Sequence, residues 1–174
     1  MISPELISAI RSQYRLSWNG LHGCGHWARV LENGLRLAAE TGANPQVVEL
    51  FAVFHDACRI NDDWDPNHGG RGADLAVAFR GKYFELGDTD FIALKYACRL
   101  HTDGMTTGDI TALTCWDADR LDLGRVGMMP YKDLLCTAAA KRPQLFEWAN
   151  NRAFNRVIPE FAMKNWTHMV MTAS

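Results

Sequence analysis

A histidine followed directly by an aspartate stands near the end of the apolar stretch VVELFAVFHDACRI. Glu49 is the only polar residue of that stretch before His55, so a helix formed by it would be largely buried. Burying the carboxylate of Asp56 is costly unless a cation pairs with it. Imidazole and carboxylate form a usual ligand set for zinc, manganese, iron or nickel, so the pair fits a buried metal site. The alternative is a packed histidine beside an aspartate that meets a basic side chain, and it is favoured while the dipeptide is considered alone.

Two further histidines stand in the segment LHGCGHWARV. His22 and His26 are four residues apart, so they share one face if the helix extends back to His22. Gly23 and Gly25 interrupt that extension, and the segment can instead form an irregular entry to the helix. His26 lies inside the periodic part and is the better ligand candidate. Its alternative role is that of a boundary histidine bonded to a backbone carbonyl.

Three carboxylates are concentrated in the segment CWDADRLDLGRVG. Asp117, Asp119 and Asp122 fall within six residues of a predicted helix that also carries Trp116 and Leu121. A solvated acidic face accounts for Asp122 and one other aspartate, but not for three interleaved with apolar residues and arginines. Asp117 and Asp119 point about 200° apart around a helix, so only one of them is expected to bind a given ion.

Two other histidines stand at predicted helix ends. In NHGGRGA, His68 precedes a helix N-terminus, where free N–H groups and the helix dipole favour anions, and Arg71 could add a phosphate contact. An exposed histidine in a plain loop is an equal alternative there. His101 ends a predicted helix before a glycine-containing loop, where a histidine is also a routine partner of the helix dipole.

Taken in order, these residues resemble the HD-domain superfamily of metal-dependent phosphohydrolases. The pattern of that superfamily is a histidine, a distant His-Asp pair and a later aspartate, all on helices. The resemblance implies metal ligation by His26, His55 and Asp56. Its late motif, A-D-x-L, matches A-D-R-L here, which makes Asp119 the first choice for the remaining ligand and Asp117 the alternative.

The resemblance also implies roles for the other candidates. HD proteins place extra histidines in intermediate segments, where they contact substrate phosphate or complete a second metal site, and His68 and His101 are the candidates for this. Together with Asp56 they are the expected catalytic groups, and Arg71 and His22 are the expected substrate-binding residues. The implied reaction is hydrolysis of a phosphoester or pyrophosphate bond, with a nucleotide as the expected substrate. The implied cofactor is a divalent ion, whose identity among Mn, Mg, Fe, Co, Ni and Zn the ligand types leave open.

Two other functions stay open at this point. Some HD-type scaffolds hold two irons and oxidise their substrates, which here would require His68 and His101 as additional ligands. A non-catalytic module that senses a nucleotide is the other possibility, although the intact ligand pattern argues against it. A homodimer is compatible with either function.

The elements that must position these residues all read as helices. Apolar residues recur at helical spacing with turn residues between the segments, and no segment alternates as a strand does. The expected fold is all-α, a compact HD-domain-like bundle of about seven or eight helices. The predicted helices cover about residues 4–16, 22 or 26 to 40, 45–60, 70–80, 90–100, a segment from 109, 130–140 and 143–165.

The domain organisation follows from the same reading. Residues 1–174 are expected to form a single HD-type domain, with a motif core at about 20–125, the part covered by the resemblance. C-terminal helices at 130–168 are expected to pack on that core. No linker or internal repeat divides the chain.

The bulk composition limits the classes of partner. The chain has 174 residues, of which 48% are hydrophobic and 22% charged, with a net charge of -2. No basic stripe is present, so an extended nucleic-acid surface is not expected. No stretch approaches the ~20 apolar residues of a membrane span, and the start lacks the features of a signal peptide, so a cytoplasmic protein without membrane contact is expected. The five cysteines contain no CxxC pair and are expected to be reduced thiols.

Overall fold

The computed structural model describes residues 2–167, and all regular elements in that part of the chain are helical. Between these residues the β contacts are limited to an isolated bridge between Arg80 and Phe84, so no sheet forms. The α-helices and the short helical turns, labelled η, are α1 (Pro4–Arg11), α2 (Cys24–Thr41), α3 (Pro45–Phe54), α4 (His68–Phe79), α5 (Asp88–Leu100), α6 (Ile110–Arg120), η1 (Leu123–Val126), η2 (Lys132–Leu134), α7 (Ala138–Lys141), α8 (Pro143–Phe154), α9 (Glu160–Ala162) and η3 (Met163–Thr167).

The all-α prediction is confirmed. Every described α-helix except α7 and α9 has eight or more residues, in agreement with the expected seven or eight helices. Four predicted helices have wrong bounds. The first helix ends at Arg11, and the helix expected at 45–60 ends at Phe54. The helix expected at 130–140 is replaced by η2 and α7, and the helix expected at 143–165 ends at Phe154. Residue 1, and the ends expected at 168 and 174, lie outside the described residues.

Local capping explains where the central helices begin. The side chain of Asn44 accepts a hydrogen bond from the Gln46 N–H, and Pro45 occupies the first turn of α3. Asp109 caps α6 in the same way through the Thr111 N–H. Because both caps are local, the starting residues of α3 and α6 are fixed before any tertiary contact forms.

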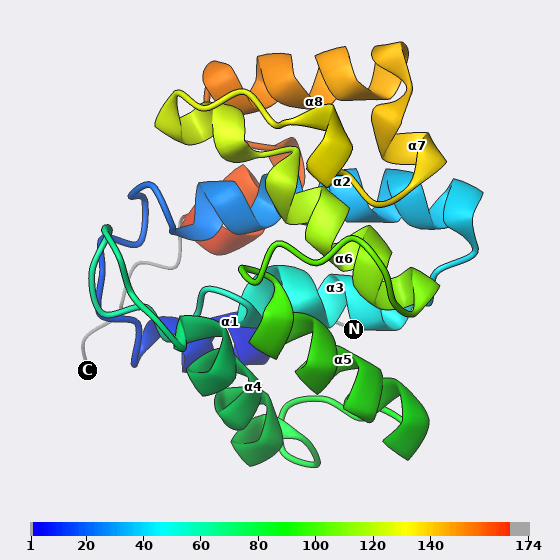
Figure 1. Ribbon diagram of the computed structural model, residues 1–174. Helices are drawn as coiled ribbons and strands as arrows, with labels where there is room; N and C mark the ends of the chain where they lie inside the picture. The colour runs from blue at the N-terminus through cyan, green and yellow to red at the C-terminus, as the bar shows by residue number, and fades with distance from the viewer. Residues whose placement is uncertain (1, 168–174) are drawn as a thin grey trace.

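The bundle is built around α2 and α3. In Figure 1, α2 crosses the middle of the molecule, with α8 on one side of it and α3 on the other, and α4 and α5 lie beyond α3. Trp27 of α2, Phe51 and Phe54 of α3 and Trp116 of α6 are fully buried between these helices. Burial of these large side chains supplies the main driving force for bringing α2, α3 and α6 together.

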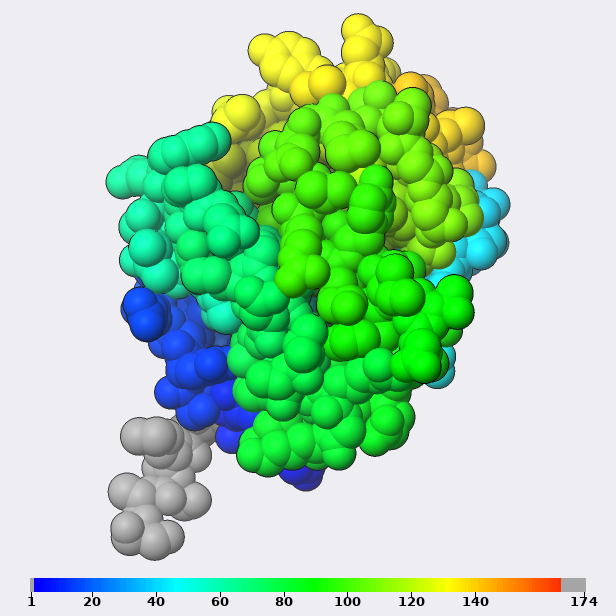
Figure 2. Space-filling model, turned by 60° about the horizontal axis from the view of Figure 1, so that its bottom comes forward, coloured from blue at the N-terminus to red at the C-terminus, as the bar shows by residue number. Residues whose placement is uncertain are grey.

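Close backbone contacts hold α4 against its neighbours. A Cβ atom added at Gly69 would lie 2.1 Å from the carbonyl oxygen of Cys98 in α5, and one added at Gly72 would lie 2.1 Å from that of Phe54 at the end of α3. Figure 2 shows α4 and α5 covering one face of the molecule as a continuous surface. The two glycines therefore set the approach that brings the start of α4 to the ends of α3 and α5.

Substitution of Gly72 by alanine is expected to destabilise the fold by about 3 kcal/mol, because its methyl group would overlap a backbone carbonyl that has no freedom to move. Gly87→Ala is the matched control, since Gly87 has open space around it and is exposed, and its expected cost is below about 1 kcal/mol. Urea unfolding of the two variants measures the difference. Equal midpoints would show that the contact between α4 and α3 is not tight.

Candidate metal centre

The four residues expected to bind the metal lie together. His26 comes from the first turn of α2, His55 and Asp56 follow α3, and Asp119 comes from the last turn of α6. The Nε2 atoms of His26 and His55 are 3.0 Å apart. Asp119 Oδ1 lies 3.4 and 3.8 Å from these two nitrogens. Asp56 Oδ2 lies 3.6 and 3.9 Å from the same nitrogens. This compact set of two imidazoles and two carboxylates is called group 1.

The hydrogen bonds of group 1 fix how its histidines are protonated. His26 Nδ1 lies 2.8 Å from a carboxylate oxygen of Asp122, and His55 Nδ1 lies 3.1 Å from the carbonyl oxygen of Phe51. Because both partners accept, each Nδ1 carries the hydrogen and each neutral ring presents a lone pair at Nε2. Two lone pairs facing each other at 3.0 Å repel unless a cation lies between them.

A proton does not supply that cation near neutral pH. Burial lowers the pKa of His26 well below its usual value, and the positive charge of Arg125 lowers it further. Burial also lowers the pKa of His55, to about 4, against the opposing charges of Asp56 and Asp119. Both rings are therefore neutral at pH 7, and the donor set of group 1 fits a divalent metal ion.

A second set of ligands, called group 2, adjoins the first. His68 at the start of α4 and His101 at the end of α5 have Nε2 atoms 3.0 Å apart. Each Nδ1 donates to a backbone carbonyl, His68 to Asp65 at 2.6 Å and His101 to Cys98 at 2.7 Å. Asp56 Oδ1 lies 3.1 Å from His68 Nε2 and 3.7 Å from His101 Nε2. Group 2 thus repeats the arrangement of facing imidazoles beside a carboxylate, with the difference that Arg59 Nη1 lies 3.3 Å from His68 Nε2.

Groups 1 and 2 differ in how easily they accept a proton. Burial lowers the pKa of His101, but its hydrogen bond with Asp56 and the charge of Asp119 outweigh that effect, so the net shift is upward. A proton can therefore occupy group 2 in place of a metal. The sets His26, His55 and Asp56, and Asp56, His68 and His101, each have the spacing to hold an ion.

Asp56 belongs to both groups. Its Oδ2 faces the histidines of group 1 and its Oδ1 faces those of group 2. His22 Nδ1 donates to Oδ2 at 2.8 Å. Burial raises the pKa of Asp56, but the charge of His55 and the hydrogen bonds from the other histidines lower it well below the usual value. The carboxylate is therefore ionised and has the geometry to bridge two cations.

Several supporting charges were not predicted. Asp122, which receives the His26 hydrogen bond, is itself held by Arg29 through contacts of 2.7 and 3.0 Å. Arg59 Nη1 lies 3.7 Å from Asp56 Oδ1. Helical spacing could have predicted both arginines. Arg29 follows His26 by three residues and Arg59 follows Asp56 by three residues, so each pair would share one helix face.

Three sequence candidates belong to neither group: His22, which contacts Asp56, and Asp117 and Arg71, which have other partners. Asp117 accepts hydrogen bonds from the backbone N–H groups of Cys136 and Thr137 at 2.7 and 2.8 Å, so it anchors that segment rather than facing His26. Arg71 contacts both carboxylate oxygens of Asp65, at 2.6 and 2.7 Å, and donates to two backbone carbonyls. Of the two candidate aspartates, Asp119 is the one beside the histidines, and substrate binding by Arg71 stays a prediction.

Asp122→Asn is expected to weaken metal binding about 10- to 100-fold. The substitution replaces the carboxylate that orients the His26 ring and increases the basicity of that ring with a neutral amide. The matched control is Asp117→Asn, which removes an equally buried carboxylate nearby that does not contact the histidines. Competition against a fluorescent chelator measures both affinities. Equal losses in the two variants would mean that general destabilisation, and not ligand orientation, is responsible.

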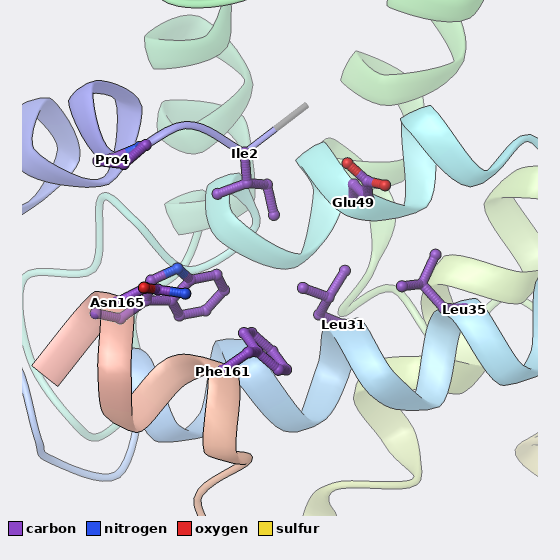
Figure 3. Close-up of a pocket in the computed structure, with 8 residues that line it drawn as sticks. Ile2, Pro4, Leu31, Leu35, Glu49, Phe161 and Asn165 are labelled. Atoms are coloured by element: carbon purple, nitrogen blue, oxygen red, sulfur yellow. The ribbon is translucent and has the colours of Figure 1, made fainter.

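An apolar pocket of about 310 Å³ lies elsewhere in the molecule. Figure 3 shows Ile2, Leu31, Leu35 and Phe161 around it, between the chain start, α2, α3 and the C-terminal turns. None of the histidines or aspartates of groups 1 and 2 lines it. The pocket therefore has no role in the chemistry of the metal centre.

The chain was also compared with known proteins, and its helices were checked for membrane-spanning character. None of the helices between residues 2 and 167 has the length and apolar character that a membrane crossing requires. No protein-family model, curated protein or solved structure matches the chain significantly.

Proposed function

We propose that the protein is a metal-dependent phosphohydrolase that binds two divalent ions, one in group 1 and one in group 2. The observation that carries the proposal is the pair of facing imidazoles in each group, with Nε2 atoms 3.0 Å apart and Asp56 between the two pairs. Every ligand histidine has its other ring nitrogen bonded to a carboxylate or a carbonyl, as metal-binding histidines usually do. The resemblance to HD-domain phosphohydrolases is in line with this proposal.

The surroundings of the centre suit a phosphorylated substrate. When bound, divalent ions polarise a phosphoryl group and lower the pKa of a coordinated water. Asp119 has 17% of its side chain exposed, whereas His26 and His55 are fully buried, so we expect substrate to approach from the side of Asp119. From there its carboxylate is suited to orient an attacking water or accept its proton. Arg59 and Arg125, both buried beside the centre, would stabilise negative charge on phosphate oxygens.

His22 is suited to the substrate-binding role expected for it. Its Nδ1 is used by Asp56, while its Nε2 has no hydrogen-bond partner among the described residues. Nε2 is therefore available to a phosphate oxygen or a leaving group. A nucleotide remains the expected substrate class.

A phosphate-release screen tests the proposal. The purified protein is treated with a chelator, and Mn, Mg, Co, Ni or Zn is then added with a panel of nucleotides and bis-p-nitrophenyl phosphate. Metal-dependent turnover in the wild type, and its loss in His55→Ala, is the expected result. Unchanged hydrolysis in a double variant at His55 and Asp56 would refute the proposal. Tight nucleotide binding without turnover would instead support the sensing function.

A di-iron oxygenase is the second candidate, because group 2 supplies the two extra histidines that such a centre requires. Imidazole ligands suit iron as well as zinc and nickel. Anaerobic loading with ferrous iron followed by exposure to oxygen distinguishes the two functions. A visible absorption band and oxygen uptake, without phosphate release from any substrate, would favour the oxygenase.

A further inference from the structure

A second cavity lies directly beside the candidate metal centre. It has a volume of about 210 Å³ and is formed by the start of α2, by η1 and by the segment that follows α8. His26 lines it, as do three arginines: Arg29, Arg125 and Arg156. These three residues come from separate parts of the chain, so the tertiary fold concentrates their charges around one space.

The positive charge around this cavity exceeds the negative charge. Arg29 pairs with Asp122 through two contacts, and Arg125 Nη1 lies 3.9 Å from the same carboxylate. Arg125 otherwise donates to the carbonyl oxygens of Leu21 and Asp122. Asp122 is therefore the close carboxylate of both guanidinium groups, and both of these side chains are more than nine-tenths buried. An anion in the cavity would add a further counter-charge for these buried guanidinium groups.

Arg156 has free donors at this cavity. Its Nε donates to the carbonyl oxygen of Arg125 at 3.3 Å, while its two terminal nitrogens have no hydrogen-bond partner among the described residues. Arg29 also keeps donor capacity, because its hydrogen bonds to Asp122 and Val157 use only three of its five N–H groups. Donors from two arginines are thus available to the same ligand.

Hydrogen bonds from the N–H groups of Arg156 and Val157 to the carbonyl oxygens of Ala153 and Arg152 close the end of α8 and require the left-handed backbone of Arg156. Its φ is 48°, in the left-handed region, just after the end of α8. Glycine or asparagine usually occupies this position of a helix C-terminus, and another residue there costs on the order of 1 kcal/mol.

The start of α2 contributes a further donor. Gly23 caps the helix without a side-chain hydrogen bond, and the N–H of His26 has no backbone partner among the described residues. A Cβ atom added at Gly25 would lie 3.6 Å from Arg29 Nη1 and from Ile158 Cγ1, in ordinary contact distance. The absence of a side chain at Gly25 therefore leaves open the space between Arg29 and Ile158.

From these contacts we infer that the cavity beside His26 is a binding site for a phosphate group. Guanidinium forks match phosphate oxygens bidentately, and a helix N-terminus adds backbone donors and a favourable dipole. Three arginines on different sides suit a tetrahedral anion better than a planar carboxylate. The group can come from free phosphate or pyrophosphate, or from a second phosphate of the substrate. The site does not depend on the proposed hydrolase activity.

Calorimetric titration of the chelator-treated protein with phosphate and pyrophosphate tests this inference. The wild type is expected to bind, and Arg156→Gln is expected to bind at least about tenfold more weakly, because it loses charge-assisted hydrogen bonds. Gly25→Leu, which fills the cavity, is expected to abolish binding. The control is Arg99→Gln, which removes an exposed arginine that pairs with Asp74 and lies outside the cavity. No binding by the wild type, or equal binding by Arg156→Gln, would overturn the inference.

Further titrations and kinetics separate this site from the metal centre and identify the source of the phosphate. Asp56→Ala is expected to bind pyrophosphate as tightly as the wild type. If its affinity for pyrophosphate fell as much as that of Arg156→Gln, the anion would be bound at the metal centre and the inference would be overturned. With a hydrolysed substrate in hand, a KM that rises in Arg156→Gln only for compounds with two phosphate groups indicates the substrate as the source. If KM is unchanged, and added phosphate alters the wild-type rate but not that of Arg156→Gln, the source is free phosphate. If hydrolysis is never found but the titrations succeed, the proposed function fails and the anion site stands.

Discussion

Replacing Asp56 with alanine is expected to remove both metal ions at once and to lower turnover by at least about 1,000-fold. The reason is the shared position of its carboxylate, with Oδ2 in group 1 and Oδ1 in group 2. Removing it leaves group 2 with no carboxylate and group 1 with Asp119 as its single carboxylate. Single replacements of His55 or His101 affect only one group each.

Metal analysis of the purified variants measures this difference. We expect two ions in the wild type, about one in His55→Ala and in His101→Ala, and none in Asp56→Ala. Circular dichroism serves as the check that each variant is folded. Retention of two ions by Asp56→Ala would show that the carboxylate is not a bridge, and normal turnover would exclude it from the reaction.

Metal binding is expected to raise the unfolding temperature by roughly 15 to 30 °C over the chelator-treated protein. An ion present at about 1,000 times its Kd stabilises a folded site by about 4 kcal/mol, so two independent sites give about 8 kcal/mol. For a chain of this size each kcal/mol shifts the transition by about 2–4 °C. The ligands come from the ends of five different helices, so the gain applies to the fold as a whole.

Scanning calorimetry with and without a saturating metal tests this expectation. His101→Ala is the useful comparison, because it keeps group 1 and should show about half of the shift. A shift below about 2 °C in the wild type would mean that groups 1 and 2 do not bind the added ion tightly. That result would weigh against every metal-dependent function considered above.

The sequence allowed the central helices to be predicted because their signals are local. Asn44 and Pro45 mark the start of α3, and the apolar run to His55 marks its burial, and both agree with the structure. The C-terminal segment was predicted less well. The helix expected to continue to 165 stops at Phe154, ahead of the left-handed Arg156, and the proline at 159 was an available signal for that break.

The residues that the sequence singled out as ligands do lie together, but their surroundings were not predicted. Helical spacing established that Asp117 and Asp119 face apart, but it does not determine which of them faces His26. That choice depends on the rotation of α6 against α2, which is set by packing of residues distant in sequence. The engagement of Arg71 by Asp65 was not predictable for a similar reason, because it depends on the path of the loop between α3 and α4.

The ligands of the metal centre are dispersed along the chain, and this has a consequence for biosynthesis. His26 and the carboxylate that orients it, Asp122, are 96 positions apart. During translation the ribosome completes α2 and α3 well before Asp119 emerges, so the nascent chain exposes isolated histidines that are weak chelators by themselves. Contacts over such sequence separations form late in folding. Metal uptake would therefore follow the docking of α6, and the bound ion would mark molecules that have completed their fold.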